Sequence, residues 1–270
     1  MTDRVRFRPF TGDSTTRIRL KAAPLALVLC QIRWPEMTSL QGDLKPAALR
    51  LGTQLEDYPI FGETRELGYA ITPDGIQPTA GGMIYQWQSI DARWHVSFAR
   101  RFLSFFCTEY GDYEEFSARL SSVITSLAAT IRVPLFDRVG IRYVNRISDP
   151  RLVDDLDSYV RPEVLGYSAL RPQSQEVRLV SSANQARYEV GELALQVRTG
   201  VIPPGETVDP SVKPLDVESW IMDLDASAEQ VAPFDADSIV AQAGRLSDVA
   251  YDYFKLVTTE GFVREFGGEV

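Results

Sequence analysis

The stretch from Arg138 to Ile147 constrains the fold most strongly, because its side chains separate into two sets at a period of two. This period is typical of a β-strand, whose successive side chains point to opposite faces of a sheet. One face would carry Val139, Ile141, Tyr143, Asn145 and Ile147, and the other would carry Arg138, Gly140, Arg142, Val144 and Arg146. Because the stretch lies mid-chain and follows a long amphipathic helix, we expect a central strand.

Two long amphipathic helices are predicted, each after a group of strands. In the first, Tyr113 to Arg132, apolar residues recur every three or four positions, as expected of a helix that lies on a sheet. The second opens at Asp237 or Ser238 and runs to about Val257, with Asp237 as the expected N-cap. Shorter helical segments are expected at Lys45–Tyr58 and within Asp149–Val164.

Other apolar stretches, bounded by turn residues, predict further strands. These are expected at Pro24–Trp34, Met83–Ile90, Arg93–Ala99, Phe102–Thr108, Glu176–Ser182, Gln185–Arg198 and Leu215–Asp225. Two stretches rich in Gly and Pro, Pro59–Gly82 and Thr199–Pro214, are interpreted as long connections. The first of them has room for a short strand at Leu67–Ile71.

This order of segments predicts an α+β fold, in which an antiparallel sheet has long helices packed on one face. Residues 1–21 are polar and basic and are interpreted as an N-terminal arm, and residues 22–270 as a single α+β unit. Each possible half, 22–134 and 135–270, runs as a strand, a group of antiparallel strands and a long helix. An internal pseudo-repeat is therefore an open alternative.

Charge is unevenly distributed along the chain, whose net charge is −9. Residues 1–33 hold seven basic and two acidic side chains, whereas residues 201–270 hold four basic and fourteen acidic ones. Opposed ends suit head-to-tail contact or intramolecular docking, and solvated faces of opposite sign are the plainer alternative. The acidic balance argues against nucleic acid as a partner, because phosphate contacts need clustered Lys and Arg.

The cysteines and the hydropathy pattern indicate a cytoplasmic protein. Cys30 and Cys107 each lie in an apolar run, which suggests buried thiols rather than a disulfide framework. The N-terminus lacks the order of a signal peptide, since Thr11 to Thr16 is polar. The longest apolar run, Ala22 to Cys30, is far shorter than the ~20 residues of a membrane helix, so no membrane association is expected.

Few catalytic or metal-binding patterns are present, and no cofactor is predicted. The single histidine, His95, excludes histidine-rich metal sites. Asp223 and Asp225, two residues apart on one strand face, are weak candidates for Mg²⁺ ligands. The alternative is that such carboxylates complement the N-terminus of the last helix, as expected of Asp235 and Asp237.

The predicted ligand- or partner-binding residues come mainly from the central strand. They are Arg138, Arg142, Tyr143, Asn145, Arg146, Trp87 and Trp94. Arginines at every fourth strand position lie roughly 13 Å apart, too far to converge on one small anion. They suit an extended anionic partner, or structural ion pairs with neighbouring strands. For the tryptophans, the alternative to a binding role is a place in the core.

Four stretches carry a resemblance to a known family. They are Pro24 to Trp34, Tyr110 to Phe116, the Gly140-Ile141-Arg142-Tyr143-Val144-Asn145 core of the central strand, and Phe254 to Phe266. In these the chain resembles uncharacterised, sporadically distributed bacterial proteins of about this length. The resemblance implies a free-standing cytoplasmic protein of the mobile or defence-associated part of bacterial genomes. It implies no catalytic residues.

Two functional hypotheses follow. The first is a non-enzymatic protein-interaction module, such as an antitoxin, immunity or chaperone-like component, that binds a protein partner or forms a homodimer through exposed strand edges. The second is a small-ligand or anion-binding sensor, or an enzyme with an acidic metal site. A pocket that includes Tyr143 and Asn145 would favour the second hypothesis.

Overall fold

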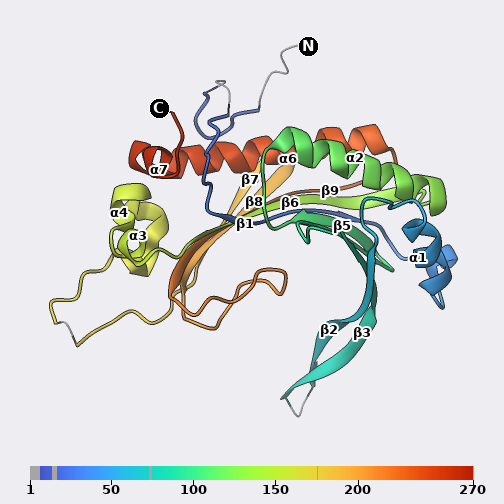
Figure 1. Cartoon of the computed structure of the whole chain (residues 1–270), viewed down its shortest axis with the longest axis horizontal. Coiled ribbons are helices and arrows are strands. Elements are labelled where there is room, and N and C mark those ends of the chain that lie inside the picture. Colours follow the sequence, from blue (N-terminus) through green and yellow to red (C-terminus); the bar gives the residue numbers. More distant parts are fainter. Residues whose placement is uncertain (1–6, 14–16, 73–74, 175, 270) are drawn as a thin grey trace.

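The computed structural model describes residues 7–13, 17–72, 75–174 and 176–269, which form one antiparallel sheet with helices on one face (Figure 1). The nine strands are β1 (Leu25–Arg33), β2 (Ile60–Thr72), β3 (Gly75–Gln88), β4 (Trp94–Ala99), β5 (Phe102–Cys107), β6 (Leu135–Ile147), β7 (Asn184–Val190), β8 (Leu193–Ile202) and β9 (Ser219–Pro233). Their order across the sheet is β2-β3-β4-β5-β1-β6-β9-β8-β7. The α+β fold is thus confirmed.

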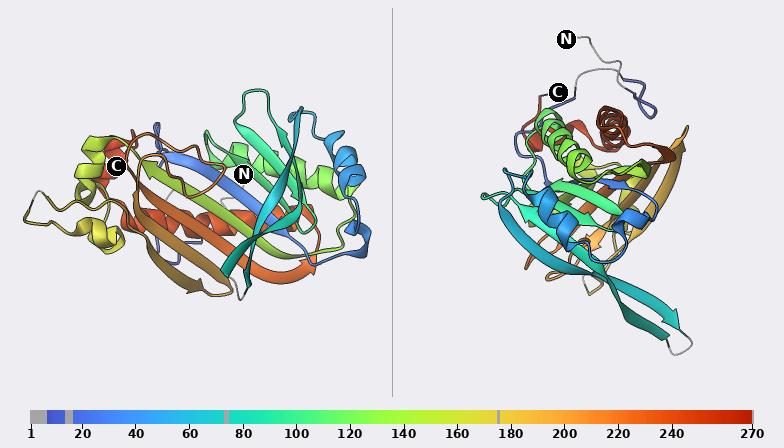
Figure 2. Two further views of the ribbon diagram at one scale, coloured as in Figure 1. Left: turned by 90° about the horizontal axis from the view of Figure 1, so that it is seen from below. Right: turned by 90° about the vertical axis from the view of Figure 1, so that its right-hand side faces the viewer.

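Two long helices cover one face of the sheet. The helices are α1 (Lys45–Gly52), α2 (Tyr113–Thr130), α3 (Pro150–Asp154), α4 (Leu156–Tyr159), α5 (Pro162–Leu165), α6 (Ala236–Val257) and α7 (Glu260–Glu265), with 3₁₀ turns at Thr38–Leu40 and Gly166–Ala169. Helices α2 and α6 lie side by side on the convex face, and the opposite face is concave (Figures 1 and 2). No helix in the described ranges is both long and apolar enough to cross a bilayer.

The core lies between these helices and the sheet, where the sequence periodicity places it. The apolar set of β6, with Val139 and Ile141 fully buried, belongs to the same core cluster as the stripe of α2 that includes Leu120 and Val123. Helix α2 begins at Asp112, whose carboxylate accepts a hydrogen bond from the backbone N–H of Glu115. The cap and the stripe together explain why this segment is helical.

The two halves of the chain meet at the centre of the sheet. The first strands of the two halves, β1 and β6, pair with each other. Each of them also pairs with the last strand of its own half, β1 with β5 and β6 with β9. A long helix follows β5 and β9 alike. The topology therefore has the pattern expected of a strand-group-plus-helix pseudo-repeat, with one strand fewer in the second half.

Several expectations about the strands are wrong. The predicted connection Pro59–Gly82 is instead β2 and the first half of β3, a hairpin that extends from the sheet as a long arm (Figure 1), and the short strand expected at Leu67–Ile71 lies within β2. Glu176–Ser182 contains no strand in its described residues, and the predicted strand Gln185–Arg198 is a hairpin that turns at Gly191. A positive φ of 62° at Gly191 permits this two-residue turn between Val190 and Leu193.

The N-cap of α6 differs from expectation, and the described part of the N-terminal arm lies against this helix. Asp235, rather than Asp237, caps α6, and its carboxylate accepts a hydrogen bond from Ser238 N. The described part of the basic arm is not free, because residues 7–13 and 17–21 contact α6. This is the intramolecular docking that the opposed charges allowed.

Candidate functional site

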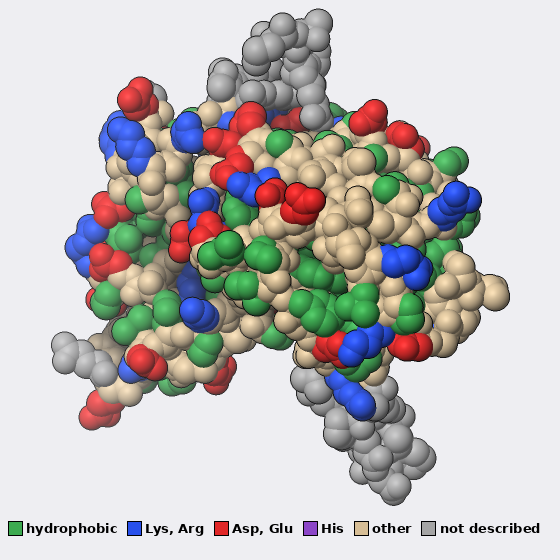
Figure 3. All heavy atoms as spheres, turned by 45° about the vertical axis from the view of Figure 1, so that its right-hand side comes forward, with side chains coloured by type: hydrophobic (Ala, Val, Ile, Leu, Met, Phe, Trp, Pro, Cys, Tyr) green, Lys and Arg blue, Asp and Glu red, His purple; other side chains and the backbone are tan. Residues whose placement is uncertain are grey.

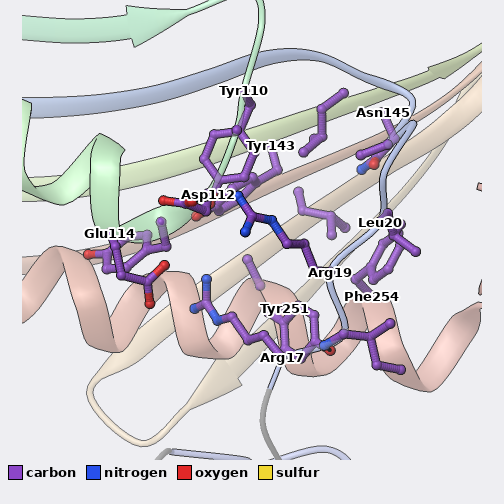
Figure 4. A pocket seen from close by; sticks show the side chains of 17 residues that line it. Arg17, Arg19, Leu20, Tyr110, Asp112, Glu114, Tyr143, Asn145, Tyr251 and Phe254 are labelled. Carbon is purple, nitrogen blue, oxygen red and sulfur yellow. Dashed lines mark hydrogen bonds and ion pairs between the residues drawn. The ribbon is translucent and has the colours of Figure 1, made fainter. Parts of the chain in front are cut away.

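A cavity of about 380 Å³ lies between the N-terminal segment, α2, α6 and the core side of the sheet (Figure 4). Its lining includes residues of five separate parts of the sequence, among them Arg17, Leu20, Tyr110, Tyr143, Asn145 and Phe254. A volume of roughly 300–1,000 Å³ with mostly apolar and aromatic walls and a few polar groups is typical of small-molecule sites. This cavity is the candidate functional site.

Arg17 supplies a guanidinium group to the cavity. Its Nη2 donates to Ser247 Oγ at 2.8 Å and to Asp248 Oδ1 at 3.0 Å. Its Cζ atom lies 5.0 Å from the ring centroid of Tyr113 and 5.2 Å from that of Tyr251, within cation–π range. Burial acts to lower the pKa of Arg17, but hydroxyl and carboxylate neighbours raise it above its ordinary value, so the group stays charged.

Tyr143 and Asn145 reach the cavity from β6, on the apolar face predicted from the sequence. The Tyr143 hydroxyl lies 2.5 Å from Ser247 Oγ. Asn145 is 4% exposed, and its Nδ2 donates to the carbonyl oxygen of Met222 at 3.3 Å. No donor in the described part of the chain hydrogen-bonds to the side-chain oxygen of Asn145, so this acceptor is available at the cavity wall.

Three tyrosine hydroxyls at the cavity remain protonated at neutral pH. Burial raises the pKa of Tyr110, Tyr113 and Tyr143, and the nearby Arg17 guanidinium only partly offsets this effect. A protonated phenol can donate a hydrogen bond. Arg17 and the tyrosines therefore make the cavity rich in donors.

The two ends of the cavity differ in polarity (Figure 4). Leu20 and Phe254 lie at one end, and Arg19 and Asp112 lie toward the other. Arg19 pairs with Asp112 at 2.8 Å, with 74% and 34% of the two side chains exposed, so this pair lies at the surface. A ligand would meet an apolar wall at one end and charged groups at the other.

The N-terminal segment forms one wall because it is anchored to α6. Asp252, which is fully buried, accepts hydrogen bonds from Phe10 N at 2.6 Å and from Thr11 N at 3.1 Å and Thr11 Oγ at 2.5 Å. Arg8 pairs with Asp248 at 3.2 Å. The anchor thus precedes Arg17 in the chain and holds the wall in place.

The arginine row of β6 points away from this cavity, to the concave face. Arg138 lies 3.4 Å from Asp225. Arg146 is 8% exposed, and it donates to Ser219 Oγ and to the Lys213 carbonyl oxygen at 2.8 Å each. The structure therefore separates the predicted site residues, with Tyr143 and Asn145 on one side of the sheet and the arginines on the other.

Arg142 is the most strongly paired member of the row. Its Nε and Nη2 donate to the two carboxylate oxygens of Asp223 at 2.8 and 2.9 Å, and its Nη1 donates to Asp209 at 2.5 Å. Burial acts to lower the pKa of Arg142, but these carboxylates raise it above the ordinary value. Bidentate pairing of this kind is what the structural ion-pair alternative predicted.

The weak metal candidates take part in the same network. Asp223 is 1% exposed and is also 3.4 Å from Arg198, and burial raises the pKa of Asp225 despite nearby arginines. Within the described ranges, no group of three His, Cys, Asp or Glu side chains is arranged to hold a metal ion. The geometry around Asp223 is that of an ion-pair network.

Trp87 and Trp94 lie in the core, with 4% and 1% of their surface exposed. The Trp94 ring stacks on Phe105 at a centroid distance of 5.5 Å, and Trp87 contacts Phe61 at 5.7 Å. Neither lines the cavity described above. These positions agree with the alternative that the two tryptophans belong to the core.

Sequence reasoning missed several cavity residues, including Arg17, Tyr110, Tyr251 and Phe254. Arg17 lies in the segment interpreted as an arm, and nothing in its spacing relates it to β6. A scan against protein-family models found no match for this chain, and a search of curated proteins found none either.

Proposed function

We propose that the protein is a non-enzymatic bacterial protein that binds a small molecule in the cavity between β6, α2, α6 and the N-terminal segment. The observation that carries this proposal is the convergence of Tyr143, Asn145 and Arg17 on a cavity of about 380 Å³. A cytoplasmic location is part of the proposal, and the two free, buried cysteines accord with a reducing compartment.

The stretches behind the family resemblance also support a role for the cavity. Each of the four contributes lining residues: Leu25 from the first, Tyr110 from the second, Tyr143 from the central strand, and Phe254 from the last. These stretches lie far apart in the sequence, so their convergence on one cavity is a property of the fold.

The test is whether a small molecule remains with the protein after gentle purification. Native mass spectrometry should show an added mass that organic extraction releases from the wild type and that is lost or strongly reduced in Ala250→Phe. Ala250 is 1% exposed and lines the cavity, so the larger ring would occupy it. Leu20→Trp would fill the same space from the N-terminal segment and serves as a second variant.

An added mass of equal abundance in folded Ala250→Phe and Leu20→Trp proteins would contradict the proposal. The control is Leu49→Phe, since Leu49 is 50% exposed and is absent from the cavity lining. This control should retain the wild-type mass.

A second candidate function is protein interaction, favoured by exposed apolar side chains between α5 and β7. In this segment Tyr167, Leu170, Val177, Leu179 and Val180 have 62%, 67%, 59%, 36% and 57% of their surface exposed. Others lie at the base of the β2–β3 arm, where hydrophobic side chains gather among charged ones (Figure 3). Contiguous apolar surface is typical of protein-binding sites.

This candidate predicts self-association or partner binding through the segment. We expect light scattering at micromolar concentration to give a dimer mass for the wild type and a monomer mass for Leu170→Ser/Val177→Ser/Val180→Ser. The exposed residue Leu49, on α1, offers a matched control, Leu49→Ser. A monomeric wild type would exclude the homodimer and leave only a different partner to carry this second function.

A further inference from the structure

We propose that the ligand of the cavity is an amphipathic carboxylate, with its carboxylate at Arg17 and an apolar body against Leu20 and Phe254. This inference rests on the proposed function and adds the chemical class of the ligand. It follows from the polarity of the cavity, from the excess of donors at one end, and from the position of Arg17.

The donors determine the head group. An arginine side chain has five N–H donors, and Nη2 of Arg17 already supplies the bonds to Ser247 and Asp248. Tyr110 and Tyr143 line the same cavity, and the Tyr143 hydroxyl is within hydrogen-bonding reach of the Arg17 guanidinium, which still leaves N–H groups for a ligand. A ligand with carboxylate oxygens there would accept several hydrogen bonds, and those from a charged donor are the stronger kind.

The apolar walls determine the body of the ligand. Leu20, Leu25, Leu224 and Phe254 line the cavity together with Ala250. Each methylene group buried against such a wall strengthens binding about fourfold. An unbranched alkyl chain or a single ring would therefore fill this part better than a second charged group.

Asn145 adds a selectivity feature along the wall. Its side chain is 4% exposed, and its amide oxygen accepts no hydrogen bond from the described residues. A hydroxyl or N–H group on the body of the ligand could donate to this oxygen. A hydroxylated carboxylate should therefore bind more tightly than the unsubstituted one, because its hydroxyl would add a hydrogen bond at the wall and the unsubstituted ligand would cover the oxygen without pairing it.

The test compares carboxylates with alcohols of equal length. Sodium butyrate, hexanoate, octanoate and decanoate are each titrated against the full-length protein, after extraction of any retained molecule and refolding, and so are the matching 1-alkanols. Isothermal calorimetry should give an affinity for at least one carboxylate that is tenfold or more above that of its alcohol. Ala250→Phe should abolish this binding, and Arg17→Gln should weaken the carboxylate but not the alcohol.

The outcomes separate the two proposals. Equal binding of carboxylates and alcohols, blocked in Ala250→Phe, would leave a ligand-binding cavity but overturn the carboxylate assignment. A retained molecule that lacks an acidic group would likewise overturn the carboxylate assignment and leave a ligand-binding cavity. Binding of no member of either series, with no retained mass on the native protein, would overturn the ligand class and the proposed function together. Binding unaffected by Ala250→Phe would place the probes elsewhere and would also overturn the assignment.

Discussion

Asp223→Ala should lower the free energy of unfolding by about 3 kcal/mol, because it leaves a largely buried arginine without its bidentate partner. Asp223 is 1% exposed and holds Arg142 through two hydrogen bonds of 2.8 and 2.9 Å. Arg142 would keep its contact with Asp209, which places the loss at the lower end of the range for broken buried pairs. Urea denaturation monitored by tryptophan fluorescence measures the effect, with an unchanged slope against denaturant.

Asp225→Ala is the matched control for this variant. Asp225 lies two residues after Asp223 on the same strand, but its side chain is 25% exposed and its contact with Arg138 is 3.4 Å long. We expect a loss of at most about 1 kcal/mol, as for partly exposed ion pairs. Similar losses in the two variants would contradict the ion-pair interpretation. A ligand that binds only the folded state stabilises it. If millimolar Mg²⁺ stabilised the wild type but not Asp223→Ala, this result would also contradict the ion-pair interpretation.

The parts of the fold that could be predicted from the sequence are those with a strong period. Helix α2 and strand β6 have long, regular apolar patterns, and both lie close to their expected bounds. Only parts of β2 and β3 were predicted, at Leu67–Ile71 and Met83–Ile90, because the Gly and Pro residues between Pro59 and Gly82 indicate turns, whereas the structure accommodates them in a two-stranded arm. The hairpin at Gly191 was missed because one glycine is a weak turn signal.

Part of the candidate site could be predicted from the sequence, and the rest could not. The period of β6 predicts that Tyr143 and Asn145 share the core face and that the arginines share the other face, which the structure shows. The period does not indicate which distant segment of the chain covers the strand. Arg17 reaches the cavity because a buried carboxylate on α6 holds the N-terminal segment, and no local pattern encodes a contact across 240 residues.

The cavity changes the relative weight of the two hypotheses made from the sequence. The arginine row was the strongest argument for an extended anionic partner, but Arg138 and Arg142 pair with aspartates of the same chain. Nε, Nη1 and Nη2 of Arg142 all donate to these carboxylates, so few of its N–H groups remain for a partner. The alternative with a small ligand gains instead, because Tyr143 and Asn145 line a cavity of ligand size.

Asp252→Ala should release the N-terminal segment and open the wall of the cavity. The Asp252 carboxylate is fully buried and accepts three hydrogen bonds from Phe10 and Thr11. Hydrogen bonds to charged groups contribute about 1.5–3 kcal/mol each, and their loss is only partly offset by rehydration of the released backbone. A decrease of about 2 kcal/mol in the local opening free energy would raise cleavage of the segment by trypsin roughly thirtyfold.

The cleavage is measured by mass spectrometry at Arg17, Arg19 and Lys21, the basic residues that follow the anchor. Asp237→Ala is the control, because Asp237 lies on the same helix but is exposed and is not the N-cap. It should leave the cleavage rate within about twofold of the wild type, and equal rates in Asp252→Ala and the wild type would show that Asp252 does not anchor the segment. Because this segment carries Arg17 and Leu20 into the cavity, Asp252→Ala should also lose the retained small molecule, and a bound ligand should slow the cleavage of the wild type.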